Sequence, residues 1–449
     1  MTLPLSPRAR VAERAFLVLA WLLIAYLLVW HGLVFPLSSP SADYGKHWYA
    51  AVAILHGESP YKGPDLYLGF NYPMLTGFLF LHLAAFSLDV GETVWEITNF
   101  LFVIAGALVL VWGFRPGGDE RNEALEGTGV IPGLRSFLRR HWLTTVFLLV
   151  ANYQPLHRVL IASNLEPLNM LLGAMFVAFA ARRRDTAAGI TLTVFALTKL
   201  APVFILIPLV AMRRWRIVFA SLGAFAVYGL FLLVTGYWRT ELFLYTDVVP
   251  RIPFTYMDLS CSLHRFAASV LDPAILENEE AYKGLVFKLN VVMMLVYLGI
   301  VALWMRLKHR DPLVFLAWGC FMVLPFTPLL EINHFVWVTG AVFLQLHAWR
   351  TGRMSDIGFV MCVACWVGIM NLAWVLSLPR ALGLNIPTFY PQTFILVVVL
   401  ALSGAVAFMR VPGEEDVQAH HGDTEARRNE ERREQNLETE KSSGKSLSD

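Results

Sequence analysis

The feature that most constrains this chain is a series of apolar runs that are long enough, or nearly long enough, to cross a lipid bilayer. A spanning helix needs about 20 mainly apolar residues. Because such a segment must satisfy its own backbone polar groups, the sequence predicts an all-α integral membrane protein, a multi-pass bundle of about 11–13 membrane helices. The runs occupy residues 14–35, 73–88, 95–113, 141–156, 166–181, 187–211, 216–235, 285–306, 312–328, 334–348, 356–377 and 391–409.

Composition excludes most soluble classes of protein. Hydrophobic residues make up 57% of the 449 residues and charged residues 16%, whereas soluble domains are about 45–50% apolar and about 25% charged. The small basic excess is scattered along loop ends, so we expect no nucleic-acid partner. Four cysteines are too few for a disulfide scaffold, and the C-x-x-C of Cys362 and Cys365 lies inside an apolar run, where helix packing is the favoured interpretation.

The two ends of the chain differ in character. Several arginines precede the apolar run Ala15–Phe35, which is longer than a signal-peptide core and lacks a small-residue cleavage site, so we expect a retained first helix. Residues 411–449 hold 11 acidic and 6 basic residues, which leaves 23 acids and 30 bases, a net charge of +7, in the first 410. We therefore divide the chain into a membrane domain, 1–410, and a disordered cytoplasmic tail, 411–449.

Basic clusters between the runs predict the orientation, because Lys and Arg favour cytoplasmic loops. Polar stretches 36–72, 236–284 and 378–390 then lie on the outer face, where we expect amphipathic loop helices. Arginine-rich loop 114–140 also reads as cytoplasmic, which requires that one of the two runs before it be partial or re-entrant. The basic clusters are Arg182–Arg184, Arg213–Arg216, Arg306–Arg310 and Arg350–Arg353.

The segment between Arg184 and Arg213 has basic residues at both ends but is too short for two crossings. Lys199 and Pro202 lie at its middle. This pattern predicts a broken pair of short helices whose bend points Lys199 toward the outer side, inside a protein-lined cavity, since irregular backbone at membrane depth is tolerated only there. A buried ammonium is a functional candidate by default.

The first outer loop contains the candidate base. Trp48, Ala51, Val52 and Leu55 recur at helical spacing, so part of this loop should be an amphipathic helix on the membrane surface. Asp43 precedes that helix. Two interpretations stay open at this point: a structural N-cap, or a general base at the membrane–water boundary.

Three cationic or ionisable groups join Asp43 on the same side: Lys199, Arg265 and His334. The alternatives are a surface arginine and an interfacial histidine that is already hydrogen-bonded. One carboxylate and several cations suit sugar transfer from a lipid phosphate: the carboxylate takes the proton of the acceptor hydroxyl, and the cations stabilise the leaving phosphate. We expect no cofactor and no metal, because the donor arrives within the membrane and the first loop lacks a D-x-D pair.

Several short motifs, in order, resemble glycosyltransferase family 87, the polyprenol-phosphate-mannose-dependent mannosyltransferases with the multi-pass GT-C fold. The similarity runs over roughly residues 15–410. The matching elements are Asp43-Tyr44, Gly57, Pro60-Tyr61, Tyr72-Pro73, Lys199-Leu-Ala-Pro202, Ser260-Cys-Ser262-Leu-His-Arg265 and Thr327-Pro328 with Asn333-His334.

The resemblance implies that Asp43 is the base of an inverting hexosyltransferase. We predict that the substrate is bound by Tyr44, Tyr61, Asn164, Lys199, Arg265, Asn333 and His334. The chain departs from the family where a Gly-Gln-x-Asn stretch is replaced by Ser163-Asn164-Leu-Glu166, and where one of two paired histidines is Asn333. These departures bear on the identity of the sugar and the acceptor.

The resemblance also implies the partners: a polyprenyl-phosphate-linked sugar donor, by family a mannose donor, a lipid or glycan acceptor, and membrane lipid. Transfer would take place on the outer face of a prokaryotic cytoplasmic membrane. A transporter or flippase of a lipid-linked saccharide is the main alternative, although no inverted repeat is visible. A structural subunit with a decayed site is the third.

Overall fold

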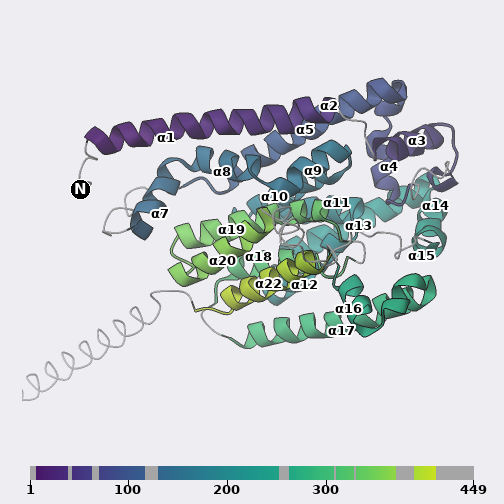
Figure 1. Cartoon of the computed structure of the whole chain (residues 1–449). Helices are drawn as coiled ribbons and strands as arrows, with labels where there is room; N and C mark the ends of the chain where they lie inside the picture. Colours follow the sequence, from purple (N-terminus) through teal and green to yellow (C-terminus); the bar gives the residue numbers. More distant parts are fainter. Residues whose placement is uncertain are drawn as a thin grey trace, which may run out of the picture.

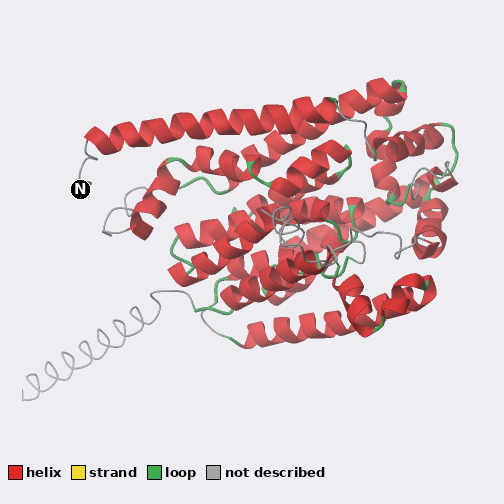
Figure 2. Ribbon diagram, viewed as in Figure 1, coloured by secondary structure: helices red, strands yellow, loops and turns green. Residues whose placement is uncertain are grey.

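A computed structural model describes residues 7–38, 43–62, 70–116, 130–251, 262–307, 310–327, 330–370 and 389–410. Throughout these residues the regular secondary structure is helical, and no strand occurs among them (Figure 2). The predicted all-α membrane class is confirmed. The predicted tail and most of the polar stretch 378–390 lie outside the described residues, so their structure stays a prediction.

Four helices are long and apolar enough to cross a membrane among the residues described. Their most apolar windows are only 17–39% buried, so most of their side chains face outward, as lipid-facing helices require. The first confirms that the N-terminal apolar run is a helix of spanning length. These four are Arg10–Leu37, which comprises α1 (Pro7–Tyr26), η1 (Leu27–Val34) and α2 (Phe35–Leu37), then α5 (Leu88–Gly113), α13 (Trp215–Thr235) and α17 (Glu279–Arg306).

Shorter helices fill the space between the long ones (Figure 1). α10 packs against α5, α11 and α19, and nearly every residue of α19 is buried. Cys362 and Cys365 are buried in α20 as free thiols, as helix packing predicts. The short helices are α8 (Trp142–Ala151), α9 (Gln154–Ala162), α10 (Glu166–Ala181), α11 (Asp185–Thr198), α12 (Leu206–Ala211), α18 (Pro312–Phe321), α19 (Thr339–Arg350), α20 (Asp356–Met370) and α22 (Phe389–Ala407).

The apolar run 73–88 does not form a spanning helix. It contains only α4 (Met74–Phe80) and the single turn η3 (Leu83–Ala85), which are too short to cross a bilayer. In the described part of the chain, α5 is then the one spanning helix between the first polar loop and loop 114–140. Because 73–88 adds no second crossing, loop 114–140 can be cytoplasmic, as its arginines predict, which agrees with the expectation that one of the two runs is incomplete.

The chain breaks at Lys199, as predicted. α11 ends at Thr198, Lys199 has an extended backbone, and the turn η5 (Ala201–Ile205) with Pro202 in its first positions leads into α12. Proline cannot continue the α11 hydrogen-bond ladder, since it lacks a backbone N–H. The break places a lysine side chain among the short central helices.

Non-spanning helices gather at one end of the molecule. α3 (Tyr44–Leu55), α4, α14 (Trp238–Phe243) and α15 (Val249–Arg251) lie together at the right of Figure 1, whereas the arginine-bearing α7 (Val130–Arg140) lies at the left. α16 (Leu263–Leu271) is a further helix of the polar stretch 236–284. The predicted amphipathic helix of the first loop is α3, whose inner face buries Tyr44, His47 and Ala51 against α4 and α5.

Candidate functional site

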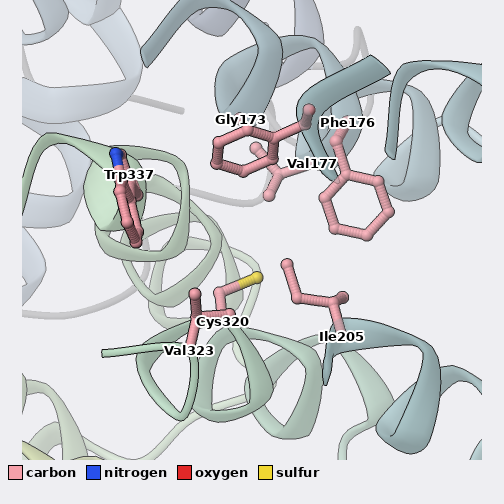
Figure 3. A pocket seen from close by; sticks show the side chains of 8 residues that line it. Gly173, Phe176, Val177, Ile205, Cys320, Val323 and Trp337 are labelled. Atoms are coloured by element: carbon pink, nitrogen blue, oxygen red, sulfur yellow. The ribbon is translucent and has the colours of Figure 1, made fainter. Parts of the chain in front are cut away.

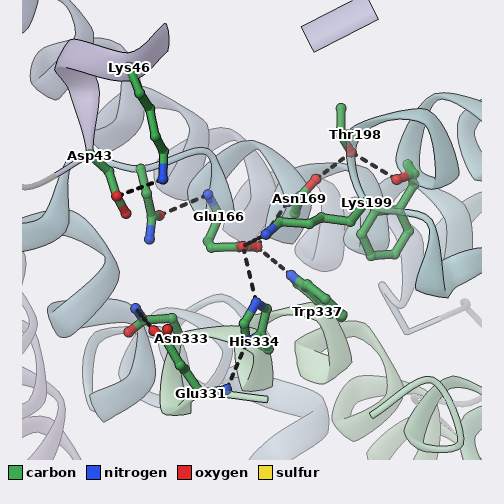
Figure 4. A network of polar contacts seen from close by, with 12 residues as sticks. Asp43, Lys46, Glu166, Asn169, Thr198, Lys199, Glu331, Asn333, His334 and Trp337 are labelled. Atoms are coloured by element: carbon green, nitrogen blue, oxygen red, sulfur yellow. Dashed lines mark hydrogen bonds and ion pairs between the residues drawn. The ribbon is translucent and has the colours of Figure 1, made fainter. Parts of the chain in front are cut away.

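A buried carboxylate, Glu166, lies at the centre of a polar cluster (Figure 4). It is the first residue of α10, and its side chain is 4% exposed. Oε1 lies 3.2 Å from Nζ of Lys199, and Oε2 accepts hydrogen bonds from Nδ2 of Asn169 at 2.9 Å and from the indole of Trp337. A buried charge is tolerated only with this degree of pairing.

The turn that carries Glu166 is held by a second polar layer from α5. Trp95 Nε1 donates to the carbonyl of Ser163 at 3.1 Å, and Asn99 Nδ2 donates to the carbonyl of Asn164 at 3.0 Å. Asn164 Oδ1 in turn accepts the backbone N–H of Glu166 at 3.0 Å. The position of the central carboxylate is therefore fixed by α5 and by the turn that precedes α10.

Lys199 is fixed from several sides. Besides the ion pair with Glu166, its ammonium lies 4.8 Å from the ring centroid of Tyr72 and 5.8 Å from that of Trp337, distances typical of cation–π contacts. The neighbouring Thr198 donates to Oδ1 of Asn169 at 2.6 Å, which ties the end of α11 to α10. The break after α11 therefore holds the Lys199 ammonium beside the Glu166 carboxylate at the start of α10.

His334 approaches this pair from the segment η9 (Ile332–Val338). Its Nδ1 accepts the backbone N–H of Glu331 at 2.9 Å, so the neutral ring carries its hydrogen on Nε2. Nε2 lies 3.9 Å from Oε1 of Glu166. Asn333 Nδ2 donates to Oε2 of Glu331 at 3.2 Å, and burial raises the pKa of the Glu331 carboxyl. Both predicted residues of this element thus lie at one polar turn.

Asp43 occupies the N-cap position of α3, but its carboxylate makes no capping hydrogen bond. The structural interpretation of Asp43 as a side-chain cap is wrong. Instead, Oδ1 accepts a hydrogen bond from Nζ of Lys46, one turn further along α3, at 2.7 Å. Lys46 is 13% exposed and Asp43 30%. The candidate base is therefore open to solvent on one side and ion-paired on the other.

The ring of Tyr72 joins the two ion pairs. Nζ of Lys46 lies 5.5 Å from its centroid, and Nζ of Lys199 lies 4.8 Å from the same centroid. The Glu331 carboxyl is within electrostatic reach of Lys46 and Lys199 as well. Two carboxylate–lysine pairs, one at the first turn of α3 and one at the start of α10, thus belong to one site.

The remaining predicted residues lie in different places. Tyr61 donates from its hydroxyl to the carbonyl of Tyr72 at 2.9 Å, so it supports the Tyr72 backbone. Tyr44 is fully buried with its hydroxyl against Gly91 of α5. Arg265 stands on α16, a helix that packs against α17 and α22. The substrate-binding roles of these residues stay predictions.

Sequence reasoning missed Lys46, Glu166 and Trp337 as site residues. Lys46 had a local signal, because it lies three residues after Asp43 on a predicted helix, and such neighbours share a helix face. Glu166 had a weaker one: an ionisable residue at the start of an apolar run. No local pattern marks the indole of Trp337, since its role depends on how η9 packs against α10.

Apolar packing lies beyond the indole of Trp337. A small cavity is lined by Trp337, Phe176, Phe195, Cys320 and other apolar residues of α10, α11, η5 and α18 (Figure 3). Among the described residues, no group of three or more His, Cys, Asp or Glu side chains is placed to hold a metal ion. The polar cluster is thus bounded by apolar side chains on the side of Trp337.

Fold and site together define a multi-pass membrane protein with two carboxylate–lysine pairs among its helices. The sequence model of glycosyltransferase family 87 matches residues 70–328. The chain belongs to this family and is a membrane glycosyltransferase. The matched range includes Tyr72, Glu166 and Lys199, whereas Asp43 and His334 lie outside it. No curated protein matches the chain significantly.

Proposed function

We propose that this protein transfers a hexose, by family mannose, from a polyprenyl-phosphate-linked donor to a lipid-linked or cell-surface glycan acceptor. The reaction takes place on the outer face of a prokaryotic cytoplasmic membrane, with inversion at the anomeric carbon. The observation that carries this proposal is the shared site around Tyr72. Its ring contacts Lys46, the partner of the partly exposed Asp43, and Lys199, whose partner Glu166 also faces His334.

The arrangement supplies the two functions that this transfer needs. Asp43 takes the proton of the acceptor hydroxyl, which attacks the anomeric carbon as the bond from that carbon to the phosphate oxygen breaks. Negative charge then develops on the phosphate. Lys199 and the Nε2 hydrogen of His334 stabilise it, because preorganised donors are most effective where charge develops in a site sheltered from water.

Purified protein, labelled polyprenyl-phosphate mannose and a lipid acceptor pool provide the test. Asp43→Asn is expected to abolish formation of the glycosylated product while leaving the elution profile and thermal stability nearly unchanged. Asp247→Asn is the matched control. Asp247 lies in another non-spanning segment, η6 (Leu244–Val248), and pairs with Arg251 of α15. Wild-type turnover in Asp43→Asn contradicts the base assignment, and movement of intact donor without product indicates a transporter.

The same assay tests the cations. Lys199→Ala and His334→Ala are expected to lower turnover by about 10²–10³, as removal of charge-stabilising donors does in other enzymes. Near-normal turnover in either variant assigns that side chain to packing alone.

A further inference from the structure

The two lysines of the site are held in different ways. Lys199 faces a carboxylate whose second oxygen accepts from Asn169 and Trp337, and its ammonium also contacts two aromatic rings. Any movement of Lys199 away from Glu166 leaves a buried carboxylate without its cation, which is strongly unfavourable. Lys199 is therefore a fixed charge.

Lys46 is less constrained. Its hydrogen bond goes to Asp43 on its own helix turn, and its other described contact is the face of Tyr72 at 5.5 Å. Both ends of the pair lie in one helix turn, Asp43 as the N-cap and Lys46 within α3. Rotation of the lysine side chain therefore breaks its contact with Tyr72 but no ion pair between helices. The carboxylate that Lys46 would leave is 30% exposed and can be solvated.

Both ammoniums of the site are ion-paired before any substrate binds. Each ammonium already faces a carboxylate, Lys46 with Asp43 and Lys199 with Glu166, and Glu331 adds a third carboxyl nearby. Among the described residues, a phosphate that enters this site therefore meets two ammoniums that each already have a carboxylate partner. Stabilisation by Lys199 and His334 increases if a second ammonium turns to the phosphate, and Lys46 can do so at the lower cost.

We infer that Lys46 is a shared ammonium, which leaves Asp43 when a lipid-borne phosphate binds beside Tyr72 and thereby frees the carboxylate to act as base. This inference rests on the proposed function. Lys46 and Lys199 then hold the phosphate from two sides of the site. The acceptor proton passes to Asp43, the bond from the anomeric carbon to the acceptor oxygen forms, and the bond to the phosphate oxygen breaks, with its electron pair leaving on the phosphate.

Binding of farnesyl phosphate to the full-length protein in detergent, followed by calorimetry, tests the exchange without any transfer reaction. Lys46→Met is expected to weaken binding about tenfold, the loss of one charge-assisted hydrogen bond. Asp43→Asn is expected to tighten binding about two- to fivefold, because Lys46 no longer has to leave a carboxylate. Lys46→Gln replaces the methionine variant where that variant misfolds.

The double variant Asp43→Asn/Lys46→Met tests whether the tighter binding expected for Asp43→Asn depends on Lys46. Its affinity should match that of Lys46→Met, so that the gain in affinity from Asp43→Asn is lost. An equal gain with and without Lys46 reflects only the removal of a negative charge and overturns the exchange. Wild-type affinity in Lys46→Met also overturns the exchange. Equally tight binding of inorganic phosphate instead overturns the lipid-borne source of the phosphate.

The matched control is Lys283→Met, because Lys283 forms a comparable pair with Glu279 on α17, one helix turn away, at 3.4 Å. It should bind farnesyl phosphate like the wild type.

In the transfer assay, Lys46→Met should raise the donor KM about tenfold, and Lys46→Arg should return the KM most of the way to the wild-type value. If the binding cycle holds but no hexose is transferred, the proposed function fails and the phosphate site stands. If transfer occurs but the cycle fails, only the exchange is wrong.

Discussion

Replacement of Glu166 by glutamine isolates the electrostatic centre of the site with almost no change of shape. Oε1 of Glu166 faces the Lys199 ammonium at 3.2 Å, and Oε2 accepts from Asn169 and Trp337. A glutamine has one oxygen and one NH₂ group in these positions, so in either orientation an N–H group points at another donor. The substitution also leaves the Lys199 ammonium without its counter-charge.

The expected cost follows from this geometry. Removal of one partner of a buried ion pair costs about 3–5 kcal/mol, because the other charge stays buried and uncompensated. We therefore expect Glu166→Gln to lower the free energy of unfolding by that amount in an SDS titration of the detergent-solubilised protein. Glu279→Gln, at the more exposed Lys283 pair, should cost about 1 kcal/mol or less.

A second substitution makes the reasoning refutable. Glu166→Gln/Lys199→Met removes both charges, so it should recover part of the stability that the single variant lost, since a neutral pair carries no uncompensated charge. If the double variant is less stable than Glu166→Gln, or if Glu166→Gln is as stable as the wild type, Glu166 is not the counter-charge of Lys199.

Two further predictions concern the packing of α3. Burial and the nearby ammoniums of Lys46 and Lys199 lower the pKa of His47 well below its ordinary value. Below about pH 6.5 the unfolded chain therefore binds a proton that the folded protein does not, so the free energy of unfolding falls as the pH drops, by at most about 1.4 kcal/mol per pH unit. Between pH 7.5 and 5.0 the melting temperature of His47→Phe should fall less than that of the wild type, and equal decreases contradict this. A Cβ on Gly91 would lie 2.2 Å from the hydroxyl of the buried Tyr44, so Gly91→Ala should destabilise the protein by about 1–3 kcal/mol; wild-type stability in thermal unfolding would show that α3 shifts freely against α5.

Local sequence signals predicted much of the fold. The break at Lys199, the helix after Asp43 and the presence of one incomplete run within 73–113 all follow from chain-local features: the spacing of apolar residues, proline, and the number of residues between basic clusters. These signals are reliable because the bilayer fixes how many residues a crossing needs.

The charge pairing could not be predicted in the same way. The partners Glu166, Lys199, His334 and Trp337 come from α10, the break after α11 and η9, and only tertiary packing brings them together. Glu166 appeared in the sequence as a departure from a family motif, and its electrostatic role became visible only in the structure. Lys46 is different, since its spacing from Asp43 alone places both on one helix face.

The shortness of α11 sets how deep a substrate must descend. Its 14 residues, Asp185–Thr198, rise about 21 Å at 1.5 Å per residue, while a hydrocarbon layer measures about 30 Å. On the proposed orientation, an ammonium at the tip of this helix, measured from the arginine-rich end, stops roughly 9 Å short of the opposite lipid surface. A donor phosphate that meets Lys199, as proposed, must then sink below the level of the surrounding headgroups, so the protein must offer it a polar path through a layer that lipids alone keep dry.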